Sequence, residues 1–432
     1  MIKSLFRHKL FKSTLIYTFG SAINKAVPFL ILPVLSYYLL PEQFGIVANF
    51  NVLFAIFVIF ANIGLDGAVS TRYFSMAKDD LKVFVFNGLL ISVISSIFLL
   101  IVISIFQGLI YEWFRIDFKY QVLTILAAFF SVITTVNLTL WRLEERPLQY
   151  GFYEISQTII NILISLLLVV VLKQGWTGRV DGILISTVLY GLFSLFFLFH
   201  RNYLKFTLNK NFIKIILLFG IPLVPHALSI WLRAGADRII ITRIVSEYYT
   251  GLYATGFQFG VFISFITMAF NNAFVPFLYK NLNEEDDNIL KKNKIKLVKL
   301  TYICLICYLF LTVFFSLISN FLIQNLFSSK YLESKDFIIW AIISQAFQGF
   351  YLLFVNYLFF TNKTRLLATI TITCSILQVA LSYLLVSHMG AIGAAYSSVI
   401  ISFINFIAVM LAAVKSIDMP WKYWIKNNVN EK

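Results

Sequence analysis

The sequence predicts an all-α polytopic membrane protein, with twelve transmembrane helices in two pseudo-symmetric six-helix bundles around a central cavity. Of its 432 residues, 60% are hydrophobic and only 13% are charged. A soluble globular chain carries about 45–50% apolar and roughly 25% charged residues. The mean hydropathy of +0.85 indicates the same class. This composition excludes a water-soluble globular protein, because too few polar residues remain to cover the apolar ones.

Apolar stretches long enough to cross a bilayer recur along the whole chain. A helix needs about 20 mostly apolar residues to span the hydrocarbon core. The expected spans are residues 13–38, 44–68, 83–108, 121–141, 151–172, 182–200, 212–234, 249–274, 297–319, 336–360, 365–387 and 391–414. The segments between them are short, so the sequence predicts no soluble domain large enough to hold a catalytic site.

The basic residues predict how the chain is oriented. With the N-terminus in the cytoplasm, 25 of the 35 lysines and arginines fall in cytoplasmic segments and nine in outer segments. The positive-inside rule therefore predicts a multi-pass protein of the bacterial cytoplasmic (inner) membrane with both termini in the cytoplasm. The same distribution explains the net charge of +15 without nucleic acid as a partner. The basic start MIKSLFRHKLFKST has no small-residue cleavage site, so we expect it to be retained.

The two halves of the chain resemble each other. The stretch GIVA at 45–48 aligns with GLYA at 251–254 at an offset of 206, and Asn137 aligns with Asn356 at an offset of 219. Units with an even number of spans keep the same orientation, so a pseudo-two-fold axis would run along the membrane normal. We therefore expect a first lobe at 1–200 (spans 1–6), a cytoplasmic linker at 201–214, and a second lobe at 215–432 (spans 7–12) with a short cytoplasmic tail.

A single lysine lies in the middle of the first span. Lys25 follows Lys12 by about 20 Å of helical rise, which places its ammonium near the middle of the bilayer. Asn24 flanks it. A charge at that depth costs at least ~2.5 kcal/mol, which an apolar residue would avoid. We therefore expect Lys25 to face a water-filled cavity.

Polar residues at helical spacing mark other spans as well. The members of each set share one face of a helix. They are Asn51, Asn62 and Asp66 in the second span; Glu154, Thr158, Asn161 and Ser165 in the fifth; His226, Ser229, Arg233 and Asp237 in the seventh; and Thr371, Ser375, Gln378 and Ser382 in the eleventh. Such residues either join helices to one another or line a wet cavity, and both interpretations stay open here. Pro28 and Pro33, and Pro222 and Pro225, predict bends in the first helix of each lobe.

Catalytic, metal and cofactor sites are not expected. The four histidines are scattered, and the sequence contains no Gly-rich loop ending in G-K-[ST] for a nucleotide. Cys304, Cys307 and Cys374 lie inside expected spans, which leaves no disulfide framework. The sequence therefore predicts a protein that is not an enzyme and carries no cofactor.

Several short motifs form a family pattern. The first span is dotted with polar residues, the turn LPEQFG occupies 40–45, and Gly64-Leu65 precedes Arg72-Tyr73. In the second half, Ala236-Asp237-Arg238 precedes Gly251-Leu252-Tyr253. With these motifs the chain resembles the polysaccharide transporters, which are the O-antigen and capsule repeat-unit flippases of the multidrug/oligosaccharidyl-lipid/polysaccharide exporter superfamily. The two-lobe layout extends this resemblance over essentially the whole chain.

The resemblance implies a flippase that moves an undecaprenyl-pyrophosphate-linked oligosaccharide to the outer leaflet by alternating access. Lys25 would hold the pyrophosphate, and Arg233 or Arg238 would add attraction from the second lobe. Sugar hydroxyls would be met by Asn24, Asn51 and Asn62. Coupling to an ion gradient would use Asp66, Glu154, His226 or Asp237. Expected partners are the lipid-linked oligosaccharide, membrane lipids, and a polysaccharide polymerase with its chain-length machinery.

Three alternatives stay open. A multidrug exporter of the same superfamily would place carboxylates in its first-lobe cavity, and Lys25 argues against it. A peptidoglycan-precursor flippase would carry two further helices and several arginines in the first lobe, which this chain lacks. A non-transporting membrane scaffold for polysaccharide assembly would use the polar residues only to join helices.

Overall fold

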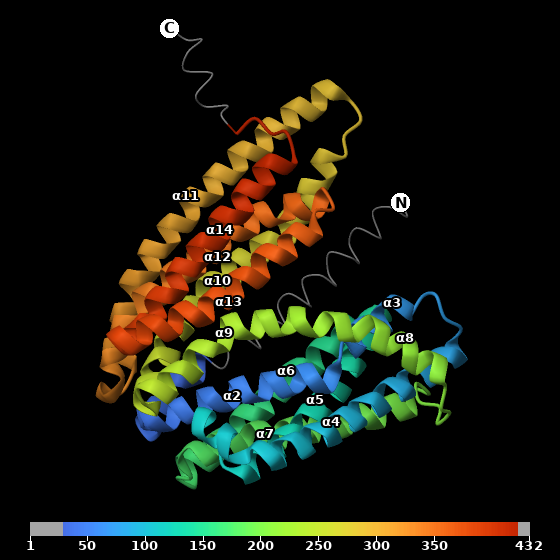
Figure 1. Ribbon diagram of the computed structural model, residues 1–432, viewed down its shortest axis with the longest axis vertical. Helices are drawn as coiled ribbons and strands as arrows, with labels where there is room; N and C mark the ends of the chain where they lie inside the picture. The colour runs from blue at the N-terminus through green and yellow to red at the C-terminus, as the bar shows by residue number, and fades with distance from the viewer. Residues whose placement is uncertain (1–28, 422–432) are drawn as a thin grey trace. The chain divides into compact units, whose positions relative to one another are not determined.

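The computed structural model describes residues 29–421, and every regular element in that range is helical (Figure 1). Within it, eleven helices are long and apolar enough to cross a membrane. The helical segment Phe29–Tyr38 is the described part of the expected first span. The predicted all-helical polytopic fold is therefore confirmed. Lys25 and Asn24 lie outside the described residues.

The chain divides into two compact units, Met1–Gly251 and Leu252–Lys432. The helices of unit 1 are α2 (Pro41–Asn62), α3 (Leu65–Arg72), α4 (Lys78–Phe114), α5 (Phe118–Leu143), α6 (Pro147–Leu166) with a π-helical turn (Leu167–Val171), α7 (Gly175–His200), α8 (Lys210–Gly220), a 3-10 turn (Ile221–Leu223) and α9 (Val224–Ile244). Helix α5 contacts α2, α4 and α7 (Figure 1). Helices α8 and α9, the expected seventh span, pack on α3, α4 and α2 within this unit. The lobe boundary at residue 215 describes the sequence repeat and stays a prediction.

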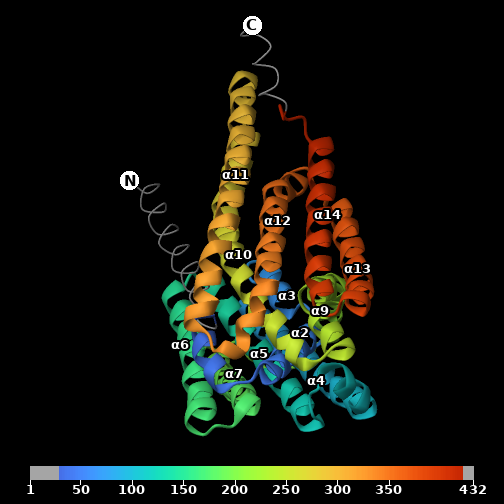
Figure 2. The same cartoon turned by 90° about the vertical axis from the view of Figure 1, so that its left-hand side faces the viewer.

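Unit 2 is built from the C-terminal helices. They are α10 (Glu247–Leu282), whose first residues belong to unit 1, α11 (Asp287–Leu326), a 3-10 turn (Ser329–Ser334), α12 (Lys335–Phe360), α13 (Thr364–Met389) and α14 (Ile392–Ser416). Helix α12 contacts α11 and α14, and α13 packs on α14 (Figure 2). A Cβ on Gly260 would lie 2.9 Å from the carbonyl oxygen of Ala341. This glycine, with Gly256 four residues before it, lets α10 approach α12 closely, as small residues do between membrane helices.

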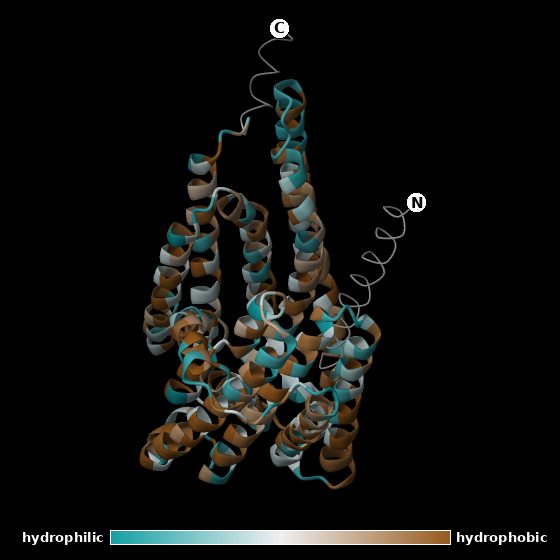
Figure 3. Ribbon diagram, turned by 90° about the vertical axis from the view of Figure 1, so that its right-hand side faces the viewer, coloured by the Kyte–Doolittle hydropathy of each residue, from teal (hydrophilic) through white to brown (hydrophobic). Residues whose placement is uncertain are grey.

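Hydropathy explains which faces of these helices stay open. Brown, apolar residues predominate along the helices, and the end where α10 meets α11 is teal (Figure 3). One face of α4 carries large apolar residues at helical spacing. They are 53–69% exposed: Ile94, Ile97, Phe98, Ile101 and Ile105. In water such a face would be unfavourable, whereas in a bilayer it contacts acyl chains that are equally apolar. Each unit buries its own core behind these faces, around Phe50 and Phe84 in unit 1, and the C-terminal helices do the same in unit 2.

Two helix breaks touch each other in unit 1. Between α2 and α3, Ile63 (φ 42°) and Gly64 (φ 67°) are both left-handed. Between α8 and α9 the helix tightens into a 3-10 turn at Ile221–Leu223, which contains Pro222. A Cβ on Gly220 would lie only 1.8 Å from the carbonyl oxygen of Ile63, so the two breaks are in backbone contact. The expected continuous span 44–68 is corrected here: a left-handed β-branched residue is an outlier that hydropathy does not reveal.

Helix α2 crosses the start of α10 with backbone against backbone. A Cβ on Gly45 would lie 2.1 Å from the carbonyl oxygen of Glu247, and a Cβ on Gly251 would lie 1.9 Å from that of Pro41. The contact is reciprocal at the offset of 206 found in the sequence, since Pro41 and Gly45 correspond to Glu247 and Gly251. Contacts of this reciprocal kind are typical of two-fold related elements.

Two ion pairs flank this crossing and attach the end of α4 to it. The Nε atom of Arg115 lies 2.8 Å from a carboxylate oxygen of Glu247. A guanidinium nitrogen of Arg243, at the end of α9, lies 2.9 Å from Glu112. Both pairs are partly exposed, so each contributes at most about 1 kcal/mol. The close glycine contact therefore determines how α2 and α10 cross, and the ion pairs add a small stabilisation to this crossing.

We expect Gly251→Ala to destabilise the protein by about 1–3 kcal/mol, because the added methyl group would force two backbones apart. The measurement is the melting temperature of the protein purified in detergent. Gly108→Ala on α4 is the matched control, since a Cβ there meets nothing within 4 Å, and it should be neutral or slightly stabilising. Equal melting temperatures for the two variants would show that the crossing is looser than described.

Candidate functional site

Arg179 lies among neutral oxygens between α6 and α7. One of its terminal nitrogens donates to Asn161 Oδ1 at 2.6 Å and to Ser165 Oγ at 2.6 Å. Asn161 in turn donates from Nδ2 to Ser186 Oγ at 3.0 Å. Ser165 and Ser186 are fully buried. These four side chains, which we call the Arg179 cluster, form a continuous hydrogen-bond network inside unit 1.

Local sequence explains how the cluster forms. Asn161 and Ser165 are one turn apart on α6, so both face the same neighbour. On α7, Gly182 lies one turn beyond Arg179, and a Cβ there would stand 2.2 Å from Ser165 Oγ. The glycine therefore allows α6 and α7 to approach until the serine reaches the guanidinium.

Within the described part of the chain, the charge of the cluster is met by neutral oxygens. Among the residues that the structure describes, Arg179 takes part in none of the ion pairs. A guanidinium has five N–H donors in a planar fork, and it pairs best with carboxylate or phosphate oxygens. Here only neutral oxygens accept from it. The cluster therefore presents a partly buried positive charge that is suited to an anion.

The spans expected at 151–172 and 182–200 left Arg179 in the connection between them, and the structure corrects this. The expected sixth span began at residue 182, whereas α7 begins at Gly175. Arg179 therefore lies within the helix. A signal was present: Asn161 and Ser165 had already been recognised as a polar face of the fifth span, and such a face needs a donor opposite it. The four-residue stripe of that span is thus explained in part as a join between helices.

The structure brings together two of the candidate residues on the second span. Asn62 donates from Nδ2 to Asp66 Oδ1 at 2.8 Å. The break at Ile63–Gly64 lies between them, so Asp66 stands in the first turn of α3. A carboxylate in that position interacts favourably with the helix dipole. Asn51, on the preceding helix, has an exposed side chain.

The candidate residues of the seventh span lie along α9. His226 is exposed, and Arg233 and Arg238 are partly buried. Asp237 is 4% exposed. The guanidinium of Arg238 donates to the carbonyl oxygen of Ala234 at 2.5 Å. Glu154, the remaining candidate, is partly buried on α6.

A second charged network closes the end of α5 and α7 at the connection to α8. Arg201 bonds to Glu144 and donates to Asn137 Oδ1 at 2.9 Å, and Tyr203 also bonds to Glu144. Arg146 completes the network with a 3.0 Å contact to the other carboxylate oxygen. Burial raises the pKa of the Tyr203 hydroxyl, and its hydrogen bond to Glu144 adds to this effect. Glu144 pairs with both Arg201 and Arg146, so this network holds the connection in place.

Comparison with known proteins places the chain in a family. Residues 34–336 match the model of a family described as polysaccharide biosynthesis protein. The chain belongs to the polysaccharide biosynthesis protein family. It is 27% identical over 384 residues to a protein of the Lsg locus of Haemophilus influenzae, covering 86% of this chain and 90% of that protein. A membrane protein of the same organism is 28% identical over 394 residues, covering 89% of this chain and 90% of its own length.

Solved structures resemble this polysaccharide biosynthesis protein in fold. An inward-facing structure of a multidrug resistance MATE family transporter of the MOP superfamily matches with a TM-score of 0.74 at 16% identity, covering 91% of this chain and 94% of its own. A MOP superfamily transporter from Pyrococcus furiosus matches with a TM-score of 0.64 at 16% identity, covering 94% and 95%. The family model confirms the sequence-based resemblance to a polysaccharide biosynthesis family, and these structures confirm the expected fold. This is a multi-pass membrane protein with a transporter fold, from a family that acts in polysaccharide biosynthesis.

We expect Asn161→Ala to lower stability by about 1–3 kcal/mol, because it removes an acceptor from a partly buried guanidinium and a donor from Ser186. Thermal unfolding of the purified protein, followed by circular dichroism, measures the effect. The control is Asn211→Ala at the start of α8, where the side chain is exposed. If both variants unfold at the wild-type temperature, the cluster does not support the α6–α7 contact.

Proposed function

We propose that this protein is a flippase for an undecaprenyl-pyrophosphate-linked oligosaccharide, either an O-antigen or a capsular or exopolysaccharide repeat unit. The observation that carries the proposal is the family match over residues 34–336 in a chain with a transporter fold. A transporter that serves polysaccharide biosynthesis must move a saccharide, and saccharides are commonly assembled on lipid carriers at the membrane. Alternating access across the bacterial cytoplasmic membrane would deliver the head group to the outer leaflet.

The chemistry of the substrate favours basic residues inside the membrane. A pyrophosphate is anionic and forms charge-assisted hydrogen bonds with lysine and arginine. Lys25, expected near the middle of the bilayer, and Arg233 and Arg238 on α9 are the proposed contacts from sequence. Arg179 joins them as a cation whose partners are neutral oxygens. Asn24, Asn51 and Asn62 would meet sugar hydroxyls, while the polyprenyl tail stays in lipid.

One structural relative shares this fold and is described with a changed pocket polarity. For the Pyrococcus furiosus transporter, a reverse polarity of the binding pocket is described as suggesting a different function. A basic binding region in this chain would likewise suit an anionic substrate and disfavour a cationic drug. The multidrug alternative is thus less well supported by the residues than the flippase.

The proposed arrangement follows the sequence repeat. A first lobe at 1–200 and a second lobe at 215–432 would be joined by the linker 201–214, with both termini in the cytoplasm. A polysaccharide polymerase and its chain-length machinery would receive the product. Coupling to an ion gradient would use Asp66, Glu154, His226 or Asp237. Among these, Asp66 is the best placed to link protonation to movement, because its carboxylate bonds across the α2–α3 break.

Removing a substrate-binding cation should reduce export strongly, while a cationic replacement should preserve it. We expect Lys25→Ala and Arg179→Gln each to lower surface glycan by about ten-fold or more, the effect of losing one charge-assisted hydrogen bond. Lys25→Arg and Arg179→Lys should retain most export. The assay is complementation of a flippase-deficient strain, with membrane protein levels matched by immunoblot.

The exposed Lys291→Ala on α11 is the control for loss of a lysine as such, and it should export normally. Normal export by both Lys25→Ala and Arg179→Gln at equal expression would contradict the anion site. It would favour the non-transporting scaffold, in which polar residues only join helices.

If a proton gradient drives transport through Asp66, collapsing that gradient should stop flipping. We expect an uncoupler to abolish translocation of a fluorescent lipid-linked oligosaccharide in proteoliposomes containing the wild-type protein. Asp66→Asn should show a low rate that no longer depends on the gradient, because its side chain cannot titrate. Wild-type rates that are unchanged by the uncoupler would remove proton coupling from the proposal but leave the flippase itself standing.

A further inference from the structure

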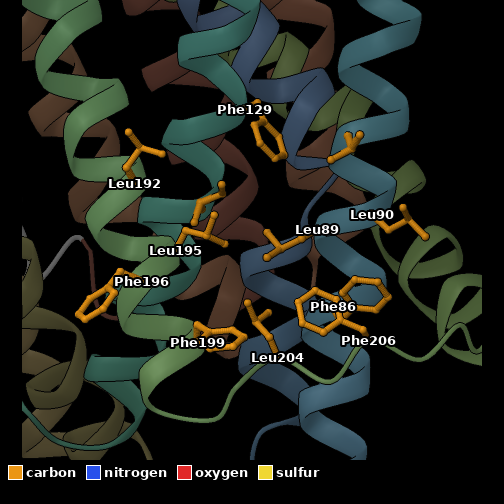
Figure 4. A pocket seen from close by; sticks show the side chains of 12 residues that line it. Phe86, Leu89, Leu90, Phe129, Leu192, Leu195, Phe196, Phe199, Leu204 and Phe206 are labelled. Carbon is orange, nitrogen blue, oxygen red and sulfur yellow. The ribbon is translucent and has the colours of Figure 1, made fainter.

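An apolar groove of about 520 Å³ lies on the surface of unit 1 between α4 and α7, and α5 forms its floor. All twelve of its lining residues are Phe, Leu, Ile or Val. Phe129 of α5 lies toward one end, and Phe86, Phe199, Leu204 and Phe206 gather at the other (Figure 4). Helices that lie against lipid usually interdigitate with few gaps, so an open channel of this size needs an occupant.

The connection between α7 and α8 closes one end of the groove. Leu204 and Phe206 point into it from this connection, and the ring of Phe206 meets that of Phe86 edge to face at 5.1 Å. The fully buried Asn87 of α4 holds the connection, donating to the carbonyl oxygen of Thr207 at 2.8 Å and accepting from Asn209 N at 3.0 Å. The groove end is thus built by specific hydrogen bonds.

A positive charge stands at this closed end. Lys205 lies between the two groove-lining residues of the connection, and its side chain is exposed. Its backbone N–H contacts the carbonyl oxygen of Lys82 at 3.4 Å. The ammonium of Lys82 is paired with Asp79 at 2.8 Å. Lys205 is in none of the ion pairs among residues 29–421, and its charge adds to that of Lys82 near Asp79.

A hydrocarbon chain is the occupant that this groove favours. Water would find no hydrogen-bond partner along its carbon lining, and an empty groove would forfeit van der Waals contacts on both walls. A lipid chain gains those contacts, and the nearby ammonium then selects the head group. The connection is expected to face the cytoplasm, where the membrane leaflet carries anionic lipids.

We propose that this groove binds one acyl chain of an anionic membrane phospholipid whose phosphate group lies beside Lys205. The site would hold a structural lipid on α4, α5 and α7, and it does not depend on the proposed transport function. A phospholipid is favoured over a polyprenyl carrier because it is present in the membrane in large excess, and occupancy follows concentration.

Native mass spectrometry of the detergent-purified protein, titrated with phosphatidylglycerol or phosphatidylcholine of the same chains, tests the proposal. The wild-type protein should bind phosphatidylglycerol more tightly. Lys205→Ala should weaken that binding about five-fold, which corresponds to about 1 kcal/mol for one lysine at an anionic head group. Lys205→Arg should retain it, and Lys291→Ala serves as the control for an exposed lysine elsewhere.

The groove itself is tested separately from the charge. Leu195→Trp places a larger side chain on the groove wall and should weaken binding of both lipids. Ile105→Trp, on a 69% exposed position of α4 outside the groove, is the matched control and should bind as wild type. Circular dichroism and gel filtration establish that each variant is folded, and the wild-type comparison of the two lipids stands without any variant.

Three outcomes would overturn the proposal. Equal affinity of the wild-type protein for the two phospholipids would remove the role of the charge. Equal binding by Leu195→Trp and Ile105→Trp would place the lipid elsewhere. Displacement of phosphatidylglycerol by an equimolar amount of undecaprenyl phosphate would identify the carrier lipid as the occupant instead.

Discussion

The bilayer interior offers no hydrogen bonds, and this constraint governs where polar groups lie in the chain. The backbone meets it by forming a helix in every apolar span of the described range. Side chains meet it in small networks between helices, such as Arg179 with Asn161 and Ser165. At the end of the same unit, Arg201 and Glu144 satisfy each other in a second network. Polar contacts therefore decide which helices are neighbours, since apolar side chains pack almost as well against lipid.

Small residues determine how closely those neighbours approach. Gly182 brings α7 against Ser165, and Gly260 brings α10 against Ala341. Gly45, Gly220 and Gly251 allow still closer contact, because each meets a carbonyl oxygen of another helix segment where any side chain would clash. Helices held by such contacts leave their remaining faces open. The apolar groove over α5 follows from this, because α4 and α7 are held to the bundle elsewhere and do not close over it.

Function builds on the same physics. A transporter for an anionic head group needs positive charge at membrane depth, and such a charge is tolerated only where dipoles or an anion compensate it. In the Arg179 cluster, the side-chain dipoles of Asn161 and Ser165 compensate the guanidinium charge. The guanidinium has further N–H groups that can donate to an anion. The α2–α3 break places a carboxylate beside a left-handed isoleucine in contact with a second break. The buried charge and the paired helix breaks thus lie within one unit.

Hydropathy and composition were sufficient to predict the membrane class, the approximate spans and the polar face containing Asn161 and Ser165, because each depends on neighbours along the chain. Short motifs were likewise sufficient for the family. Tertiary structure alone decided that Arg179 lies inside α7, that Asn62 bonds to Asp66 across a break, and that aligned glycines meet each other. These features depend on how each helix is rotated and which helix lies beside it. Sequence windows average over that rotation, and they do not contain the contact of Gly220 with the left-handed Ile63.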